Sequence, residues 1–248
     1  MSIQFLERPG KPRLAYRKQE GAGPCVVFCG GFRSDMEGTK AGFLAQQCAG
    51  RGQAYVRFDY SGHGSSAGDL DAGTIGGWAE DTLAILDQVA RGPVIIAGSS
   101  MGGWIALLAA LARPSLVKGV VGVAAAPDFT RDIYQDIFDD AHRALLKKQG
   151  YVDVPSAYSE TPYKVTRTLI EEGENHCLLD KEIPLKVPVR LLQGMQDSDV
   201  PWQKAYRIRN ALENPDLAEV LLIESGDHRL SRPEDLALLD KQIQELSV

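Results

Sequence analysis

Short apolar runs alternate with amphipathic helical patterns along most of this chain. Runs rich in β-branched and other apolar residues predict buried strands. These runs lie at residues 25–29, 54–58, 94–97, 117–123, 189–192 and 219–223. Between them, apolar residues recur at helical spacing, most clearly over residues 75–89 and in a last helix that Pro233 opens. Strands that alternate with helices predict an α/β fold with a mostly parallel, twisted sheet and helices on both faces.

Two stretches depart from this alternation. Residues 3–6 and 14–17 predict an antiparallel hairpin at one edge of the sheet. From about residue 128 to residue 186 no convincing strand occurs, and apolar residues keep a helical spacing. A long helical insertion between two core strands is the expected place for a cap over an α/β active site. We therefore expect one domain over residues 1–248 with a helical cap inserted at about 128–186.

The segment Gly98-Ser99-Ser100-Met101-Gly102 has the pattern G-x-S-x-G and lies between a predicted strand and an apolar helical run. This is the pattern of a nucleophile elbow, in which a serine occupies a sharp turn from strand to helix. Small residues two before and two after Ser100 keep such a turn free of side-chain clashes. The hydroxyl group then stands above the sheet edge, near backbone N–H groups that favour an anion. The pattern predicts that Ser100 is a nucleophile.

A serine hydroxyl needs a base, and the base needs an acid that holds it. Two loops after predicted strands supply both in the chain order that such an elbow requires, serine, then acid, then histidine. Asp197 and Asp199 follow the strand at 189–192, and His228 is the only histidine after them. Because loops at the carboxyl ends of parallel strands gather at one crevice, we expect His228 to meet Ser100 and one of the two aspartates there.

The negative charge that forms on a substrate carbonyl needs two backbone donors, which form an oxyanion hole. One is expected at the N–H group of Met101, the residue after the nucleophile. The other is expected at Phe32 N–H, because Gly30 and Gly31 let this loop approach the substrate closely. The loop at 59–66 also contains Gly-x-Gly, but no G-K-[ST] follows it. We interpret that loop as a structural turn under the active site.

Composition and charge exclude several other classes of function. With a net charge of −6 and a pI near 5.3, the chain has no basic excess for nucleic acid or for an anionic membrane. No apolar run reaches the ~18 residues of a membrane span, and no targeting segment is visible, so a cytoplasmic location is expected. The four cysteines lack framework or metal-ligand spacing and are expected to be core thiols. We expect no cofactor and no metal.

Three motifs together resemble the α/β-hydrolase-fold serine hydrolases, and the resemblance covers nearly the whole chain. They are G-x-S-x-G-G at 98–103, D-Y-x-G-x-G-x-S at 59–66 and G-x-x-D-x-x-V-P at 194–201. In that family the aspartate of the last motif is the acid of the catalytic triad, so the resemblance implies Asp197 rather than Asp199. The chain departs from many members in carrying Cys29 before the oxyanion glycine, where they have histidine or proline.

Several longer strings narrow the resemblance to a smaller group. They are similar to mitochondrial α/β-hydrolase-domain enzymes that act as acyl-protein (palmitoyl) thioesterases and acyl-glucuronide esterases. The strings lie at 36–41, 57–62, 98–104, 158–160, 176–179, 188–192 and 227–229. The resemblance implies that the substrate is a small-molecule ester or an acylated protein. Because no transit peptide precedes these strings, we expect a bacterial or processed relative.

Two other interpretations stay open. A general small-molecule carboxylesterase without protein substrates would use the same catalytic residues, and a non-catalytic protein of this fold would bind a small ligand instead. Apolar residues of the insertion would either line an acyl channel or pack the cap itself. These residues are Ile133, Ile137, Phe138, Tyr151, Tyr158 and Tyr163. Dehalogenation is disfavoured, because that chemistry uses a carboxylate at the elbow and here the residue is serine.

Overall fold

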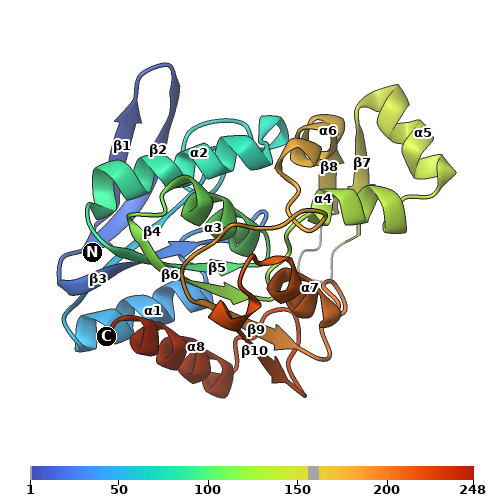
Figure 1. The fold of residues 1–248 in the computed structure, drawn as a ribbon. Helices are drawn as coiled ribbons and strands as arrows, with labels where there is room; N and C mark the ends of the chain where they lie inside the picture. Colours follow the sequence, from blue (N-terminus) through green and yellow to red (C-terminus); the bar gives the residue numbers. More distant parts are fainter. Residues whose placement is uncertain (1, 156–161) are drawn as a thin grey trace.

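The computed structural model describes residues 2–155 and 162–248, and these contain a central eight-stranded sheet (Figure 1). Its order is β1-β2-β4-β3-β5-β6-β9-β10. The strands are β1 (Gln4–Arg8), β2 (Lys11–Gln19), β3 (Ala22–Cys29), β4 (Gln53–Phe58), β5 (Val94–Ser99), β6 (Val117–Val123), β9 (Val189–Gly194) and β10 (Ala218–Ile223). Neighbours from β4 to β10 pair in parallel, whereas β1 and β2 form an antiparallel hairpin at the edge. The predicted α/β fold and its edge hairpin are confirmed.

The order of the strands reverses between β3 and β5. β4 follows β3 along the chain and lies on one side of it, whereas β5 lies on the other side. The two strands end level with each other, because Cys29 pairs with Gly98. In an open α/β sheet a crevice opens at the carboxyl ends of the strands at such a point. The loop after β3 and the turn after β5 therefore meet at one crevice.

Helices cover both faces of the sheet, and the side chains of β3 alternate between them. Val27 and Cys29 pack with apolar residues of α2, α3 and α7, whereas Val26 and Phe28 pack with those of α1 and α8. The helices are α1 (Thr39–Gly50), α2 (Ile75–Ile85), α3 (Met101–Ala112), α7 (Gln203–Ala211) and α8 (Pro233–Leu246). Short helical turns lie at η1 (Leu70–Ala72), η2 (Leu86–Ala90) and η5 (Pro215–Leu217). Burial on both faces explains why this strand is apolar at successive positions.

The insertion between β6 and β9 lies to one side of the central sheet (Figure 1). It contains α4 (Phe129–Asp132), η3 (Ile133–Ile137), α5 (Asp140–Gln149), β7 (Tyr151–Val154), β8 (Tyr163–Thr166), α6 (Arg167–Gly173) and η4 (Glu174–His176). The expectation that no strand occurs here is wrong, because β7 and β8 pair antiparallel in a small sheet of their own. Val152 and Val165 are opposite each other in this pair and pack on Phe138 and Leu146. Runs of four residues with every second position polar carry too little periodicity to be recognised.

The apolar residues of the insertion divide between packing and exposure. Phe138 is buried in the small core and Ile133 packs against it, whereas Ile137 is exposed. Tyr163 lies near the loop after β3, with its ring centroid 6.0 Å from that of Phe32. Tyr158 lies outside the described residues, as do residues 159 and 160 of the string that carries the resemblance.

The four cysteines are free and buried, as predicted for core thiols. Burial raises the pKa of the Cys29 thiol to about 12, so this thiol is inert at neutral pH. Within the part of the chain that the structure describes, no helix is both long and apolar enough to cross a membrane.

Candidate active site

Ser100 lies between β5 and α3 in a backbone conformation that L side chains rarely adopt, with φ 54° and ψ −119°. Its N–H group donates to Val123 O on β6 at 2.9 Å, which fixes the turn against the neighbouring strand. A Cβ atom on Gly98 would clash with the backbone of Gly102, and a Cβ atom on Gly102 would clash with Cys29 O. The G-x-S-x-G pattern is therefore a packing requirement, because only glycine lets these backbones approach so closely.

Ser100, His228 and Asp197 form one chain of contacts. Ser100 Oγ lies 3.2 Å from His228 Nε2, and His228 Nδ1 lies 2.9 Å from Asp197 Oδ2. The three residues follow β5, β10 and β9, whose carboxyl ends share one edge of the sheet. Asp199, the other candidate acid, is exposed, and its own N–H group donates to Asp197 Oδ1 at 2.9 Å. The structure thus brings the first three residues together and leaves Asp199 outside their contact chain.

Asp197 carries its charge in a buried position because four donors surround the carboxylate, whose side chain has no exposed area. Oδ1 accepts hydrogen bonds from the N–H groups of Asp199 and Val200, both at 2.9 Å. Oδ2 accepts from His228 Nδ1 and from Gln193 Nε2, also both at 2.9 Å. Burial by itself would raise the pKa of Asp197, but the hydrogen bonds from His228 and the two backbone groups outweigh it and hold the pKa below its usual range. The ionised carboxylate requires a proton on the imidazole nitrogen that faces it.

The loop after β3 lies against the nucleophile. A Cβ atom placed on Gly31 would be 3.5 Å from Ser100 Cβ, so the backbone of this loop passes beside the serine. Ser34 N donates to Gly31 O at 3.2 Å and closes a turn that contains Phe32. Met101, which carries the other expected donor, is the first residue of α3 and is buried. The two expected oxyanion donors, Phe32 N–H and Met101 N–H, thus belong to the two segments that flank Ser100.

His63 supports the loop after β3, a role that its sequence context does not reveal. Its Nε2 accepts the N–H group of Arg33, the residue after Phe32, at 3.2 Å, and its Nδ1 lies 3.3 Å from Ser61 O. Burial lowers the pKa of His63, so the ring is neutral and its single proton lies on Nδ1. Arg33 has φ 59°, a backbone conformation that favours glycine, and this acceptor helps to hold it. The loop at 59–66 is a structural turn, in agreement with its interpretation from sequence.

Aromatic side chains connect the loop after β3 to α2 and to the insertion. The centroid of the Phe32 ring lies 5.8 Å from that of Trp78 on α2 and 6.2 Å from that of Phe129 on α4. Tyr163 on β8 meets the same ring edge-on, and Trp104 on α3 meets Phe129 edge-on. Trp78 and Trp104 are fully buried. The insertion therefore contacts the loop after β3 directly, through the rings of Phe129 and Tyr163.

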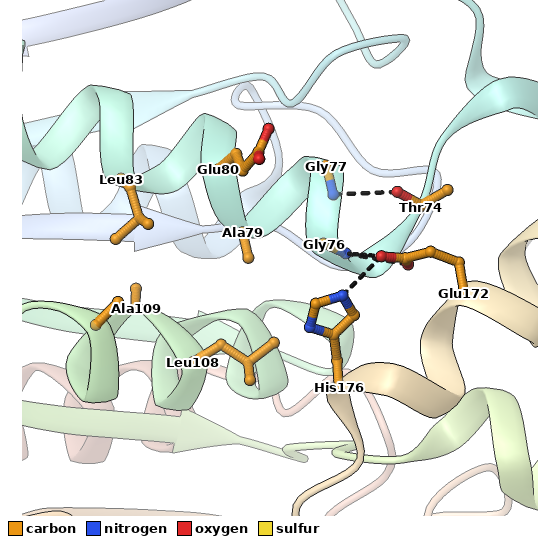
Figure 2. Close-up of a pocket in the computed structure, with 11 residues that line it drawn as sticks. Thr74, Gly76, Gly77, Ala79, Glu80, Leu83, Leu108, Ala109, Glu172 and His176 are labelled. Carbon is orange, nitrogen blue, oxygen red and sulfur yellow. Dashed lines mark hydrogen bonds and ion pairs between the residues drawn. The ribbon is translucent and has the colours of Figure 1, made fainter.

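A separate cavity of about 540 Å³ lies between α2, α3 and the end of the insertion (Figure 2). Its apolar walls include Leu83 and Leu108, and Glu172 and His176 stand at one end. Glu172 accepts the N–H group of Gly76, in the first turn of α2, at 3.2 Å and lies 2.6 Å from His176 Nε2. This pair fastens the insertion to the positive end of the α2 dipole. None of the three residues of the contact chain lines the cavity, so we assign it no catalytic part.

No three histidine, cysteine, aspartate or glutamate side chains lie close enough together to hold a metal ion, among residues 2–155 and 162–248. The buried carboxylate at the crevice, Asp197, instead has all its hydrogen-bonding capacity taken by protein donors.

Comparisons with known proteins agree with this fold. A family model described as serine aminopeptidase, S33, matches residues 22–243. The chain is 42% identical over 246 residues to a Bos taurus protein named palmitoyl-protein thioesterase ABHD10, mitochondrial, and the match covers 99% of this chain and 80% of that protein. The structure of alpha/beta hydrolase domain-containing protein 10 from mouse is similar, with a TM-score of 0.92, 40% identity and coverage of 99% of this chain and 98% of that chain. A putative hydrolase from Agrobacterium vitis S4 has a TM-score of 0.94 and 37% identity over the full length of both chains.

Proposed function

This chain belongs to the α/β-hydrolase family described as serine aminopeptidase, S33, and we propose that it cleaves carboxylic esters or thioesters through Ser100, His228 and Asp197. Membership of that family makes it a serine hydrolase. One observation carries the proposal, the unbroken contact from a strained serine to a histidine and on to a buried carboxylate. In this order Ser100 can act as the nucleophile, His228 as the base and Asp197 as the acid that holds the base.

In the first half of the reaction, His228 Nε2 takes the proton of Ser100 Oγ while Oγ bonds to the carbonyl carbon of the substrate. Asp197 keeps the other imidazole proton on Nδ1 and stabilises the positive charge that His228 gains. The bond from the carbonyl carbon to the leaving oxygen or sulfur then breaks, and His228 gives its new proton to that atom. An acyl group is left on Ser100. Water repeats the same two steps on this ester and releases the carboxylic acid.

During both halves the carbonyl oxygen becomes negatively charged. Phe32 N–H and Met101 N–H are our proposed donors to that oxygen, because their segments flank Ser100. Loss of one such donor typically lowers kcat by ~10²–10³. The neutral His63 ring keeps the first of these segments in place through Arg33 N–H.

We extend the proposal to a thioester of an acylated protein as the preferred substrate. Support comes from the 42% identity to a protein named as a palmitoyl-protein thioesterase. A small-molecule carboxylesterase that acts on simple or glucuronidated acids is the second candidate. The name of that relative includes the word mitochondrial, whereas a cytoplasmic location for this chain stays a prediction from sequence.

Hydrolysis of an S-palmitoyl peptide, compared with a short p-nitrophenyl ester, tests the proposal, with Ser100→Ala as the blank. Preference for the long thioester supports the acyl-protein thioesterase. Turnover of the short ester alone supports the small-molecule esterase and leaves the proposed triad in place. No turnover and no labelling by a fluorophosphonate probe, which reacts with activated serines, would instead support a non-catalytic binding protein.

A further inference from the structure

Gln193 is a polar side chain buried at the end of an apolar strand. It is the last residue but one of β9, and only 1% of its surface is exposed. The two residues before it, Leu191 and Leu192, are equally buried and apolar. An amide in such a position is costly unless its hydrogen bonds are made inside the protein. The partners of Gln193 therefore indicate why a polar residue stands here.

The three partners of the Gln193 amide group are all acceptors. Nε2 lies 2.9 Å from Asp197 Oδ2, 3.1 Å from Val200 O and 3.4 Å from Gly194 O. A carboxylate and two carbonyl groups cannot donate, so the group that faces them must be the NH₂ group and not the amide oxygen. The orientation of the amide thus follows from the chemistry of its neighbours.

The atom that Gln193 contacts is the atom that His228 uses. Asp197 Oδ2 accepts from Gln193 Nε2 and from His228 Nδ1, at 2.9 Å in both cases. The other oxygen, Oδ1, is held by two backbone N–H groups of the loop that follows. With one oxygen fixed from the backbone and the other fixed by Gln193, the carboxylate plane cannot rotate away from His228. A donor on Oδ2 also withdraws part of the negative charge that the imidazole faces.

We propose that Gln193 is a positioning residue for hydrolysis. It orients the Asp197 carboxylate toward His228 and withdraws part of the negative charge of that carboxylate. This inference rests on the proposed function, because it assigns Gln193 a part in the Ser100 reaction. Charged groups of the surrounding elements include Asp199, Asp227 and Arg229, all exposed, and Lys40 on α1, which donates to Arg229 O. Of the two side chains that donate to Asp197 Oδ2, Gln193 and His228, Gln193 is the one that does not titrate.

The substitution Gln193→Met removes the donor and keeps the length of the side chain. Asp197 Oδ2 then carries more negative charge, which favours the protonated imidazole that cannot accept the serine proton. The acid-side pH at which kcat/KM is half-maximal is expected to rise. The plateau value of kcat is expected to fall about tenfold, because a hydrogen bond to a charged group is lost and acts on the reacting atoms only through Asp197 and His228. KM is expected to change little.

Gln53→Met is a matched control. Gln53 is also a buried glutamine on a strand, 5% exposed, and its Nε2 donates to Pro24 O at 2.9 Å and to Ser247 Oγ at 3.0 Å. It contacts none of the proposed catalytic residues. The control variant is expected to lose thermal stability while its pH midpoint for a short p-nitrophenyl ester stays that of the wild type.

The inference is overturned if Gln193→Met lowers Tm and activity but leaves the pH midpoint at the wild-type value. The effect on Tm and pH midpoint would then be the same as that expected of the control. Should that variant not fold, Gln193→Glu preserves the shape. Its carboxyl group donates to Asp197 while protonated and repels it when ionised, so activity is expected to decline at alkaline pH where the wild type is level. A level alkaline profile in Gln193→Glu also overturns the inference. Absence of turnover in the wild type would overturn the proposed function itself, and the role of Gln193 with it.

Discussion

Replacement of Asp197 by asparagine perturbs the contact chain at its most buried member. Asp197→Asn keeps the size of the side chain and the Oδ1 acceptor that two backbone N–H groups use. In place of Oδ2 it puts an NH₂ group, which faces two donors, Gln193 Nε2 and His228 Nδ1–H, each 2.9 Å from that position. Donors do not bond to donors, so His228 is expected to move its proton to Nε2 and present Nδ1 as an acceptor.

The expected magnitude follows from that tautomer. A histidine that already carries a proton on Nε2, 3.2 Å from Ser100 Oγ, cannot accept the serine proton. In a serine protease triad the same substitution lowers kcat by about 10⁴-fold. This corresponds to roughly 5 kcal/mol of lost transition-state stabilisation. We expect a loss of similar size here, carried by kcat.

Initial rates on a short p-nitrophenyl ester measure this loss, and Asp199→Asn is the matched control. Asp199 lies two residues away in the same loop but is exposed, so its substitution is expected to leave kcat near the wild-type value. Thermal unfolding checks that both variants fold. A loss of less than tenfold in Asp197→Asn, or a greater loss in Asp199→Asn, would refute the assignment of the acid.

Three further predictions concern stability. The folded protein lowers the pKa of Asp197 below its ordinary value of 3.8, so the resulting stabilisation is present above that pH and is lost as pH falls through the folded pKa. Circular dichroism should show a steeper fall in Tm in acid for the wild type than for Asp197→Asn. Equal slopes would contradict this. Gly102→Ala forces a methyl group into the backbone at the end of β3 and should cost ~3 kcal/mol or prevent folding, whereas Gly50→Ala, where no atom lies within 4 Å, should leave Tm unchanged or raised. Glu172→Ala removes an acceptor from the first turn of α2 and should cost about 1 kcal/mol in urea unfolding, while the exposed neighbour Glu171→Ala should cost less; equal costs would argue against this anchor.

The meeting of Ser100 and His228 at one crevice could be predicted from sequence, because each residue follows the end of a strand. Glycines stand two residues before and two residues after Ser100 because a Cβ atom at either position would clash with a neighbouring backbone. His228 follows β10, and a parallel sheet brings the ends of distant strands to one crevice. The choice between Asp197 and Asp199 needed the family resemblance. In the structure Asp197 turns inward and accepts the N–H groups of its own loop, whereas Asp199 points to solvent, and spacing alone does not encode that turn.

Other features depend on contacts between segments that are distant in sequence. His63 supports the loop after β3 through the N–H group of Arg33, thirty positions earlier, and nothing in its own loop signals that partner. The pairing of β7 with β8 depends on a small core that Phe138 and Leu146 complete. In both cases the local pattern is compatible with several structures, and the tertiary contact decides between them.

The loops that carry Asp197 and His228, the proposed acid and base, pack directly on each other, and this links the proposed catalysis to stability. A Cβ atom on Gly194 would clash with the backbone of Gly226, and Gln196 N donates to Gly226 O at 2.9 Å. The buried charge of Asp197 is tolerated in this tight arrangement only because every one of its hydrogen-bonding positions has a donor. One of those donors is His228, so its loss leaves a buried carboxylate short of a partner. The bond that fixes the imidazole tautomer in the proposed mechanism therefore also stabilises the folded state.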